Sequence, residues 1–348
     1  MIFSKNIVLL LVASSLSFAN TLSGNAHAVD IVSEVRVDTG VRVEVFENAK
    51  EMEGRGRVKF VFSGNVGLKL SEDTLVQFVT SMSTGETFNG SFSTVEEGDV
   101  LRPFEVHQRR AFAEVHTKLA QTRVQAQLGA LGIESGLDNK TGLDRAGWVD
   151  GGRVIVDHPE YGEISVTVGA IVGVKSITGE DDPSFITRWE KLETINYVEI
   201  EMSKEAVIDS EVLKKISAEL GYEHLEGENY IKAAARADFN AISVILEGLV
   251  DFHGAKKIVF GYGFNLNDVV AGLNAGVFYE YYEPTLHGEL SSGIYNAEGV
   301  SWLAELGLKR KLKGGAMIKA SVKGRFAPIA QDFMVRADLT LYFRAKRK

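Results

Sequence analysis

The sequence predicts an all-β protein: an antiparallel transmembrane β-barrel of about 16 strands, with 14 and 18 strands as alternatives. Three observations predict this class. Apolar and polar residues alternate along most of the chain, an apolar leader opens it, and no later stretch resembles a transmembrane helix. The segment from Gly315 to Phe326 shows the alternation clearly. One parity holds Ala316, Ile318, Ala320, Val322 and Phe326, and the other holds Met317, Lys319, Ser321, Lys323 and Arg325.

The composition excludes several other classes. Of 348 residues, 45% are hydrophobic and 24% are charged, which excludes a disordered chain. The absence of cysteine excludes disulfide scaffolds and thiolate metal sites. Alternating barrel strands average to near-neutral hydropathy, so this ordinary composition is compatible with a barrel.

The first residues predict a signal peptide over residues 1–28, followed by the barrel over residues 29–348. Lys5 supplies the positive charge, and Ile7 to Ala19 forms an apolar region too short for a transmembrane helix. Small residues at two sites permit cleavage, and we favour the site after Ala28 because a polar segment precedes it. An uncleaved anchor or a buried first helix is the alternative.

The first half of the chain predicts strands joined by connections that alternate between short and long. Such asymmetry is typical of transmembrane barrels, whose turns at one end are short and whose loops at the other are longer. A turn at residues 63–65 would split the second strand in two. The expected strands cover residues 35–45, 57–70, 75–82, 104–118, 124–130, 153–157 and 164–174, and the expected long loops cover 85–102, 134–150 and 176–191.

The second half predicts more closely spaced strands. Residues 204–215 also fit a helical turn, and the segment 222–241 has uncertain breaks. The total is 16 or 17, and an even number is expected for a single-chain bacterial barrel, so we predict 16. The expected strands cover residues 195–202, 213–222, 230–238, 242–251, 258–266, 273–283, 288–295, 300–309, 315–326 and 334–344.

The final strand, Val335 to Phe343, resembles the C-terminal assembly signal of bacterial outer-membrane barrels, although residues 344–348 follow its last aromatic residue. With the leader and the alternation, it makes residues 34–344 similar to the porin-like superfamily, without a motif for one family. The resemblance implies a Gram-negative outer-membrane location, contact with outer-membrane lipid and with the barrel assembly machinery, and passive diffusion of small hydrophilic solutes. Porins are commonly trimers, which leaves a homotrimer open. No nucleic-acid partner is expected.

If the apolar parity faces lipid, the other parity lines the lumen. Its cations outnumber its acids, which predicts a weak preference for anions. Because the net charge is −9, we expect the acidic residues mainly in loops. The alternative is that the cations are neutralised in the wall, since Glu199, Glu201 and Glu280 could also face inward. The candidate pore-lining residues are Arg57, Lys59, Arg110, Glu114, Arg123, Glu305, Lys319, Lys323, Arg325, Arg336 and Asp338, and Lys69, Lys309 and Arg344 share their parity.

No catalytic, metal or cofactor motif stands out, so no enzyme activity and no cofactor are expected. His116 beside a serine would be the only hydrolase-like hint. Aromatic residues near strand ends, Tyr279, Tyr281, Phe264 and Trp302, predict interfacial girdles. Two other readings remain open: a non-conducting surface barrel, and a secreted soluble all-β binding protein.

Overall fold

The computed structural model describes residues 30–48, 51–84, 93–97, 100–101, 107–133, 141, 148–171, 195–225, 227–267, 269–283, 299–312, 316–328 and 332–347. The predicted signal peptide, the predicted strand at 288–295 and the predicted loop at 176–191 lie outside these residues. No helix in the described part of the chain is long and apolar enough to cross a membrane.

Sixteen of the described strands close into one antiparallel barrel, as the sequence predicts. Strands β4 and β5 form a small hairpin that extends from β2 and takes no part in the closure. The strands are β1 (Asp30–Asn48), β2 (Glu51–Lys69), β3 (Thr74–Ser83), β4 (Ser93–Glu97), β5 (Val100–Leu101), β6 (His107–Leu119), β7 (Thr122–Gly132), β8 (Trp148–His158), β9 (Gly162–Ala170), β10 (Tyr197–Val207), β11 (Leu213–Leu225), β12 (Glu228–Phe239), β13 (Ile242–Asp251), β14 (Lys256–Asn265), β15 (Leu273–Tyr282), β16 (Gly299–Lys311), β17 (Met317–Ala327) and β18 (Asp332–Arg347).

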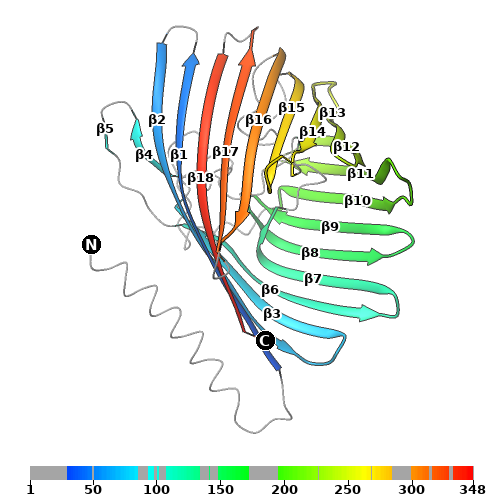
Figure 1. The fold of residues 1–348 in the computed structure, drawn as a ribbon. Coiled ribbons are helices and arrows are strands. Elements are labelled where there is room, and N and C mark those ends of the chain that lie inside the picture. Colours follow the sequence, from blue (N-terminus) through cyan, green and yellow to red (C-terminus); the bar gives the residue numbers. More distant parts are fainter. Residues whose placement is uncertain are drawn as a thin grey trace.

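The barrel closes where the first strand meets the last. β1 pairs with β18 from Ser33 opposite Arg347 to Asn48 opposite Asp332, and its other edge pairs with β2. Figure 1 shows β2, β1, β18 and β17 standing side by side as the tallest part of the wall. Closure leaves neither β1 nor β18 as an open edge, which a barrel in hydrocarbon requires.

The two ends of the barrel differ in their connections. At one end, which we call the turn end, residues 70–73, 120–121, 159–161, 208–212, 240–241, 266–272 and 312–316 join the strands. At the other, the loop end, lie the long connections 84–106, 133–147, 171–196 and 283–298, together with shorter ones. The start of β1 and the end of β18 both lie at the turn end.

The outer face carries the apolar parity. On β18, Phe333, Val335, Leu339 and Phe343 are 36–47% exposed. The ten-residue step from Phe333 to Phe343 spans about 33 Å along the strand. At a usual strand tilt this is a vertical span of about 25 Å, which matches the apolar band of a transmembrane barrel.

A continuous row of aromatic residues crosses the outer face on β14 to β18. Cross-strand neighbours join Phe260 to Tyr279, Tyr279 to Trp302, Trp302 to Phe326 and Phe326 to Phe333. The rings of Tyr279 and Trp302 meet edge to face, with centroids 5.1 Å apart. All five lie in the loop-end half of their strands, where an aromatic girdle would meet the membrane interface.

The structure corrects several boundaries expected from the sequence. Residues 63–65 continue β2 and form no turn, and residues 204–215 form strand, turn and strand instead of a helical turn. β4 and β5 lie within the expected loop at 85–102. β15 pairs directly with β16, and the expected strand at 288–295 lies outside the described residues.

We expect Leu339→Arg to lower the free energy of unfolding from lipid vesicles by about 2–4 kcal/mol, because it would place a charge near the middle of the apolar band. Met52→Arg is the matched control, since Met52 is 70% exposed and lies in the same cross-strand row as Phe333 at the edge of that band. The control should cost at most about 1 kcal/mol. Equal effects of the two substitutions in urea unfolding would contradict a lipid-facing outer surface.

Candidate functional site: the inner wall of the barrel

The predicted pore-lining residues lie on the parity opposite the exposed apolar side chains. On β17, for example, Val322 and Phe326 are 49% and 55% exposed, while the side chain of Lys323 between them is 21% exposed. The predicted residues are distributed as follows: Arg57 and Lys59 on β2, Arg110 and Glu114 on β6, Arg123 on β7, Glu305 on β16, Lys319, Lys323 and Arg325 on β17, and Arg336 and Asp338 on β18.

Most of these residues come together on one side of the lumen. On β18 and β1, Asp338 accepts a bidentate contact from Arg42, with distances of 2.6 and 3.2 Å, and lies 3.4 Å from Nε of Arg336. Glu44 lies 3.2 Å from Nε of Arg57. These paired charges form a continuous network across three strands, because β18, β1 and β2 are neighbours.

Cations exceed acids on this side, which we call the basic wall. Nζ of Lys323 contacts Glu305 at 2.8 Å, and Lys319 and Lys309 are exposed to solvent. Nζ of Lys59 lies 5.9 Å from the ring centroid of Tyr342. The basic wall consists of Arg36, Arg42, Arg57, Lys59, Lys309, Lys319, Lys323, Arg325 and Arg336, on β16, β17, β18, β1 and β2.

Three predicted residues lie elsewhere. Arg110 packs against Gly132, whose lack of a Cβ leaves room for the guanidinium group. Arg123 is 77% exposed at the turn end and forms an ion pair with Asp157 at 2.7 Å. Glu114 is 5% exposed and accepts hydrogen bonds from several glutamines. Alternation in the sequence correctly predicted that these residues lie on the inner face. It did not show that they lie on other strands than the basic wall.

Glu114 belongs to a hydrogen-bonded row that crosses the inner wall from β3 to β10. Gln77 and Gln127 both donate to its carboxylate, the second at 2.9 Å. Arg153 donates to Gln127 at 3.3 Å and to Thr167 at 2.8 Å, and Thr167 donates to Glu199 at 3.2 Å. Each member lies directly opposite the next in the strand register, so the row ties neighbouring strands together.

A second charged surface, which we call the glutamate wall, lies on β10 to β15. Its members are Glu199, Glu201, Glu219, Glu223, Glu247 and Glu280. Nζ of Lys232 lies 2.8 Å from Glu219 and 3.7 Å from Glu201, and Lys257 lies 3.9 Å from Glu280. The expectation that acidic residues lie mainly in loops is therefore wrong, because this group is built into the strands.

Part of the glutamate wall lies across the lumen from the middle of the basic wall, and the two walls adjoin where β15 pairs with β16. The same number of strands separates β1 from β11 in both directions around the barrel. The two walls differ in their access to water. Glu199, Glu219, Glu223, Glu247 and Glu280 are each at most 5% exposed, whereas Lys309, Lys319 and Arg36 are exposed. These cations of the basic wall are therefore more accessible to solvent than the five glutamates.

An apolar cluster lies on the inner wall immediately toward the loop end from the glutamate wall. Tyr197, Leu225, Leu249 and Tyr282 each follow or precede a wall glutamate by two residues on the same strand, and they are at most 6% exposed. Thr141, from the connection between β7 and β8, lies in the same region. Its backbone N–H donates to Glu247 of β13 at 3.0 Å. Thr141 therefore covers the inner wall at Glu247.

Sequence reasoning missed this cluster because it assigned every inward position to the polar parity. The signal was present: Tyr197, Leu225, Leu249 and Tyr282 are apolar at strand ends where the alternation breaks. It also missed Arg109, which a β-bulge opposite Ser81 and Met82 turns inward. Arg109 is 5% exposed, donates to Ser83 at 3.0 Å and lies 4.9 Å from the ring centroid of Trp148.

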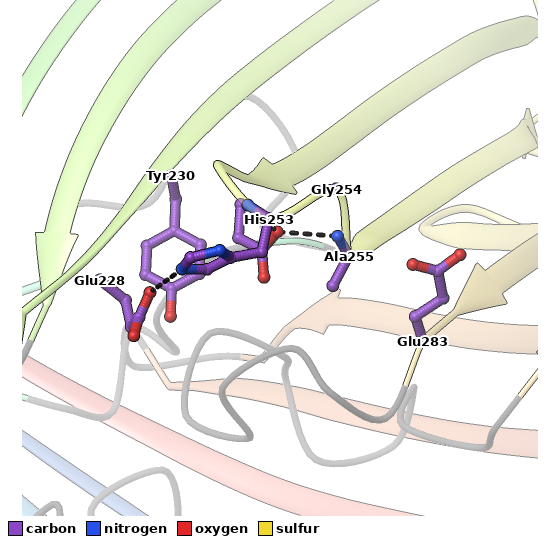
Figure 2. A pocket seen from close by; sticks show the side chains of 7 residues that line it. Glu228, Tyr230, His253, Gly254, Ala255 and Glu283 are labelled. Atoms are coloured by element: carbon purple, nitrogen blue, oxygen red, sulfur yellow. Dashed lines mark hydrogen bonds and ion pairs between the residues drawn. The ribbon is translucent and has the colours of Figure 1, made fainter.

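A pocket at the loop end has a volume of about 540 Å³. Figure 2 shows the residues that line it. His253 lies 3.2 Å from Glu228, and Asp251 accepts the backbone N–H of Ala255 at 2.7 Å. These carboxylates already serve to fix the β13–β14 turn. Among the described residues, no three His, Cys, Asp or Glu side chains are grouped to hold a metal ion.

Neither a protein-family model nor a curated protein matches the chain. Solved structures do match. OprB of Pseudomonas putida at high pH has a TM-score of 0.58 at 10% identity, covering 91% of this chain and 94% of that chain. OpdL of Pseudomonas aeruginosa has a TM-score of 0.50 at 9% identity, covering 92% and 99%. OccAB4 of Acinetobacter baumannii has a TM-score of 0.50 at 10% identity, covering 90% and 98%.

These similar structures are porins, and at such low identity the likeness concerns the fold. The closed antiparallel barrel is the feature that the likeness supports. The chain therefore has the fold of the porin-like outer-membrane β-barrels.

We expect Arg153→Met to lower the free energy of unfolding by about 2–4 kcal/mol, because it breaks the row between Gln127 and Thr167 at a site that is 3% exposed. Arg123→Met is the matched control, since its ion pair with Asp157 is largely solvated. The control should change stability by at most about 1 kcal/mol. Urea unfolding of both variants in lipid vesicles measures the difference, and similar losses would argue against a structural role for the row.

Proposed function

We propose that this protein is a porin-like outer-membrane channel through which small hydrophilic solutes diffuse passively, with a preference for anions. The single observation that carries the proposal is the unequal exposure of the two charged walls. A lumen whose accessible charge is positive concentrates anions and repels cations. The proposal places the candidate pore-lining residues of the basic wall beside the path of the solute.

The geometry supports a path along β16, β17, β18, β1 and β2. The inner wall of β10 to β15 is covered by packed protein, with Thr141 against Glu247 and the apolar cluster beside it. The basic wall retains partly exposed side chains, including Arg57 at 21% and Lys323 at 21%. Water and solutes therefore have room beside the cations and little beside the glutamates.

In this proposal the turn end faces the periplasm and the loop end faces outward, as the distribution of short and long connections favours. Export by the predicted signal peptide, recognition of β18 by the barrel assembly machinery and assembly into a homotrimer stay predictions. β18 fits an assembly signal in having Phe343 on the outer face, at 47% exposure.

A non-conducting surface barrel is the second candidate. The packed apolar cluster at the loop end favours it, because the same packing that narrows a lumen could close it. Conductance of the purified protein in a planar bilayer separates the two functions. Discrete channel events support the proposed pore, and their absence from protein that shows heat-modifiable gel migration would support the closed barrel.

We expect Lys319→Glu combined with Arg325→Glu to move the permeability ratio toward cations by roughly an order of magnitude, because the accessible charge of the basic wall would fall. Reversal potentials in a potassium chloride gradient measure this shift. Lys323 is left in place, since removing it would leave Glu305 without its partner at 2.8 Å.

The matched control is Lys204→Glu combined with Lys214→Glu. Both lysines are exposed near the turn end on β10 and β11, where they donate to the backbone carbonyls of Glu160 and Ser210. The control changes the formal charge by the same amount, but at a site outside the lumen, and should leave the selectivity nearly unchanged. A wild-type channel that prefers cations would refute the anion preference but not the pore.

A further inference from the structure

Two lysines face each other on the inner wall near the turn end. Lys309 of β16 and Lys319 of β17 are directly opposite in the strand register, and both are exposed. Like charges in this position repel each other, because side chains of opposite residues are only about 5 Å apart at Cβ. Lys311 lies one further step toward the turn end on the same face of β16.

The carboxylates described in this region form ion pairs with other cations. Each nearby carboxylate contacts another cation: Glu305 contacts Lys323, Asp338 contacts Arg42, Asp38 contacts Arg36, and Glu34 contacts Arg344. Within the described part of the chain, no hydrogen bond or ion pair joins Lys309, Lys311 or Lys319 to a carboxylate. The three ammonium groups thus present positive charge to solvent with no described carboxylate in direct contact.

These lysines line a cleft rather than a flat wall. The cleft has a volume of about 800 Å³, and its lining also includes Arg36, Asn274 and Tyr342. The ion pair of Glu34 with Arg344 lines it as well. Gly307 shapes it: a Cβ added there would lie 2.5 Å from Oδ1 of Asn274, so only glycine leaves room for this amide against the wall. The guanidinium of Arg36 lies 5.1 Å from the ring centroid of Tyr342, which holds the far side of the cleft.

The chemistry of the cleft selects for a compact anion with two charges. Lysine ammonium groups act as mobile point charges with three donors each, which suits the oxygens of a phosphate group. One dianion between Lys309 and Lys319 would replace their repulsion by two attractions. A monovalent anion such as chloride carries one negative charge and can balance the charge of only one of the two lysines.

We propose that this cleft binds a phosphate group, either as inorganic phosphate or as a phosphomonoester, between Lys309 and Lys319. The inference rests on the proposed channel function, to which it adds a solute class. A site of this kind makes transport of the phosphorylated solute saturable and lets the bound solute hinder chloride, because conduction then depends on release from the site.

The test has two independent arms. In the first, the detergent-solubilised barrel is titrated calorimetrically with potassium phosphate and, separately, with glycerol 3-phosphate at about pH 8, where both are largely dianionic. In the second, the same compounds are added to single channels conducting chloride at constant ionic strength. Comparing the two compounds distinguishes free phosphate from a phosphomonoester as the better ligand.

We expect binding by the wild type and a concentration-dependent reduction of the chloride current. Lys309→Gln combined with Lys319→Gln should weaken both by about tenfold or more, because two close charge contacts are lost. Lys204→Gln combined with Lys214→Gln should leave both unchanged.

The outcomes separate this inference from the proposed function. Anion-selective channels that neither bind nor are hindered by either compound would refute the phosphate site and leave the pore standing. Calorimetric binding that the Lys309 and Lys319 substitutions abolish, in protein without channel events, would support the site and refute the pore. Equal binding by the wild type and both double variants would overturn the assignment of Lys309 and Lys319.

Discussion

The hydrogen bonds between β1 and β18 are the constraint on which the other features depend. They join the first strand to the last over the run from Ser33 to Asn48, so neither strand keeps an open edge. In hydrocarbon an unpaired backbone group costs several kcal/mol, and a sheet can remain there only if it closes. Closure also separates two surfaces, because successive side chains on a strand point to opposite faces.

The separation of faces explains why the outer wall carries mostly apolar side chains with few specific contacts, while the inner wall carries networks of paired charges. Outward side chains such as Leu339 meet only lipid, and any apolar residue of moderate size suits that position. Inward side chains meet each other across a confined space, where an unpaired charge is costly. Strand alternation places these charged side chains on the inner face. The row from Gln77 to Glu199 and the contacts of Lys232 with two glutamates give them hydrogen-bond and ion-pair partners there.

The lumen is asymmetric because the charged side chains of its two sides differ in burial and in pairing. On β10 to β15 the charges are buried beneath packed protein, with Tyr197 and Leu249 fully buried beside Glu199 and Glu247. On β16 to β2 most charges are paired but remain partly exposed, and among the described residues no ion pair joins Lys309 or Lys319 to a carboxylate. A negatively charged chain can therefore expose a cluster of cations on one side of its inner wall, since net charge does not report which groups reach water.

Alternation in the sequence predicted a barrel of 16 or 17 strands and the faces of Lys319, Lys323 and Arg325, because a period of two follows directly from strand geometry. The number 16 also needed the rule that single-chain bacterial barrels have an even number of strands. It could not settle residues 63–65, where small and polar residues resemble a turn but β2 continues. Nor could it find Arg109, whose inward position depends on a bulge relative to a strand paired with it.

What the sequence by itself determined is therefore the local rule: which segments are strands, and which parity of each meets lipid. What only the tertiary structure decided is which inward residues meet one another and which of them reach water. The glutamates of β10 and β11 and the cations of β1 and β2 lie far apart in the chain and come to line one closed lumen only when β1 pairs with β18. Burial of the glutamates depends on contacts such as that of Thr141, in the connection between β7 and β8, with Glu247 on β13. No local pattern encodes such contacts, because they arise from the closure of the whole sheet.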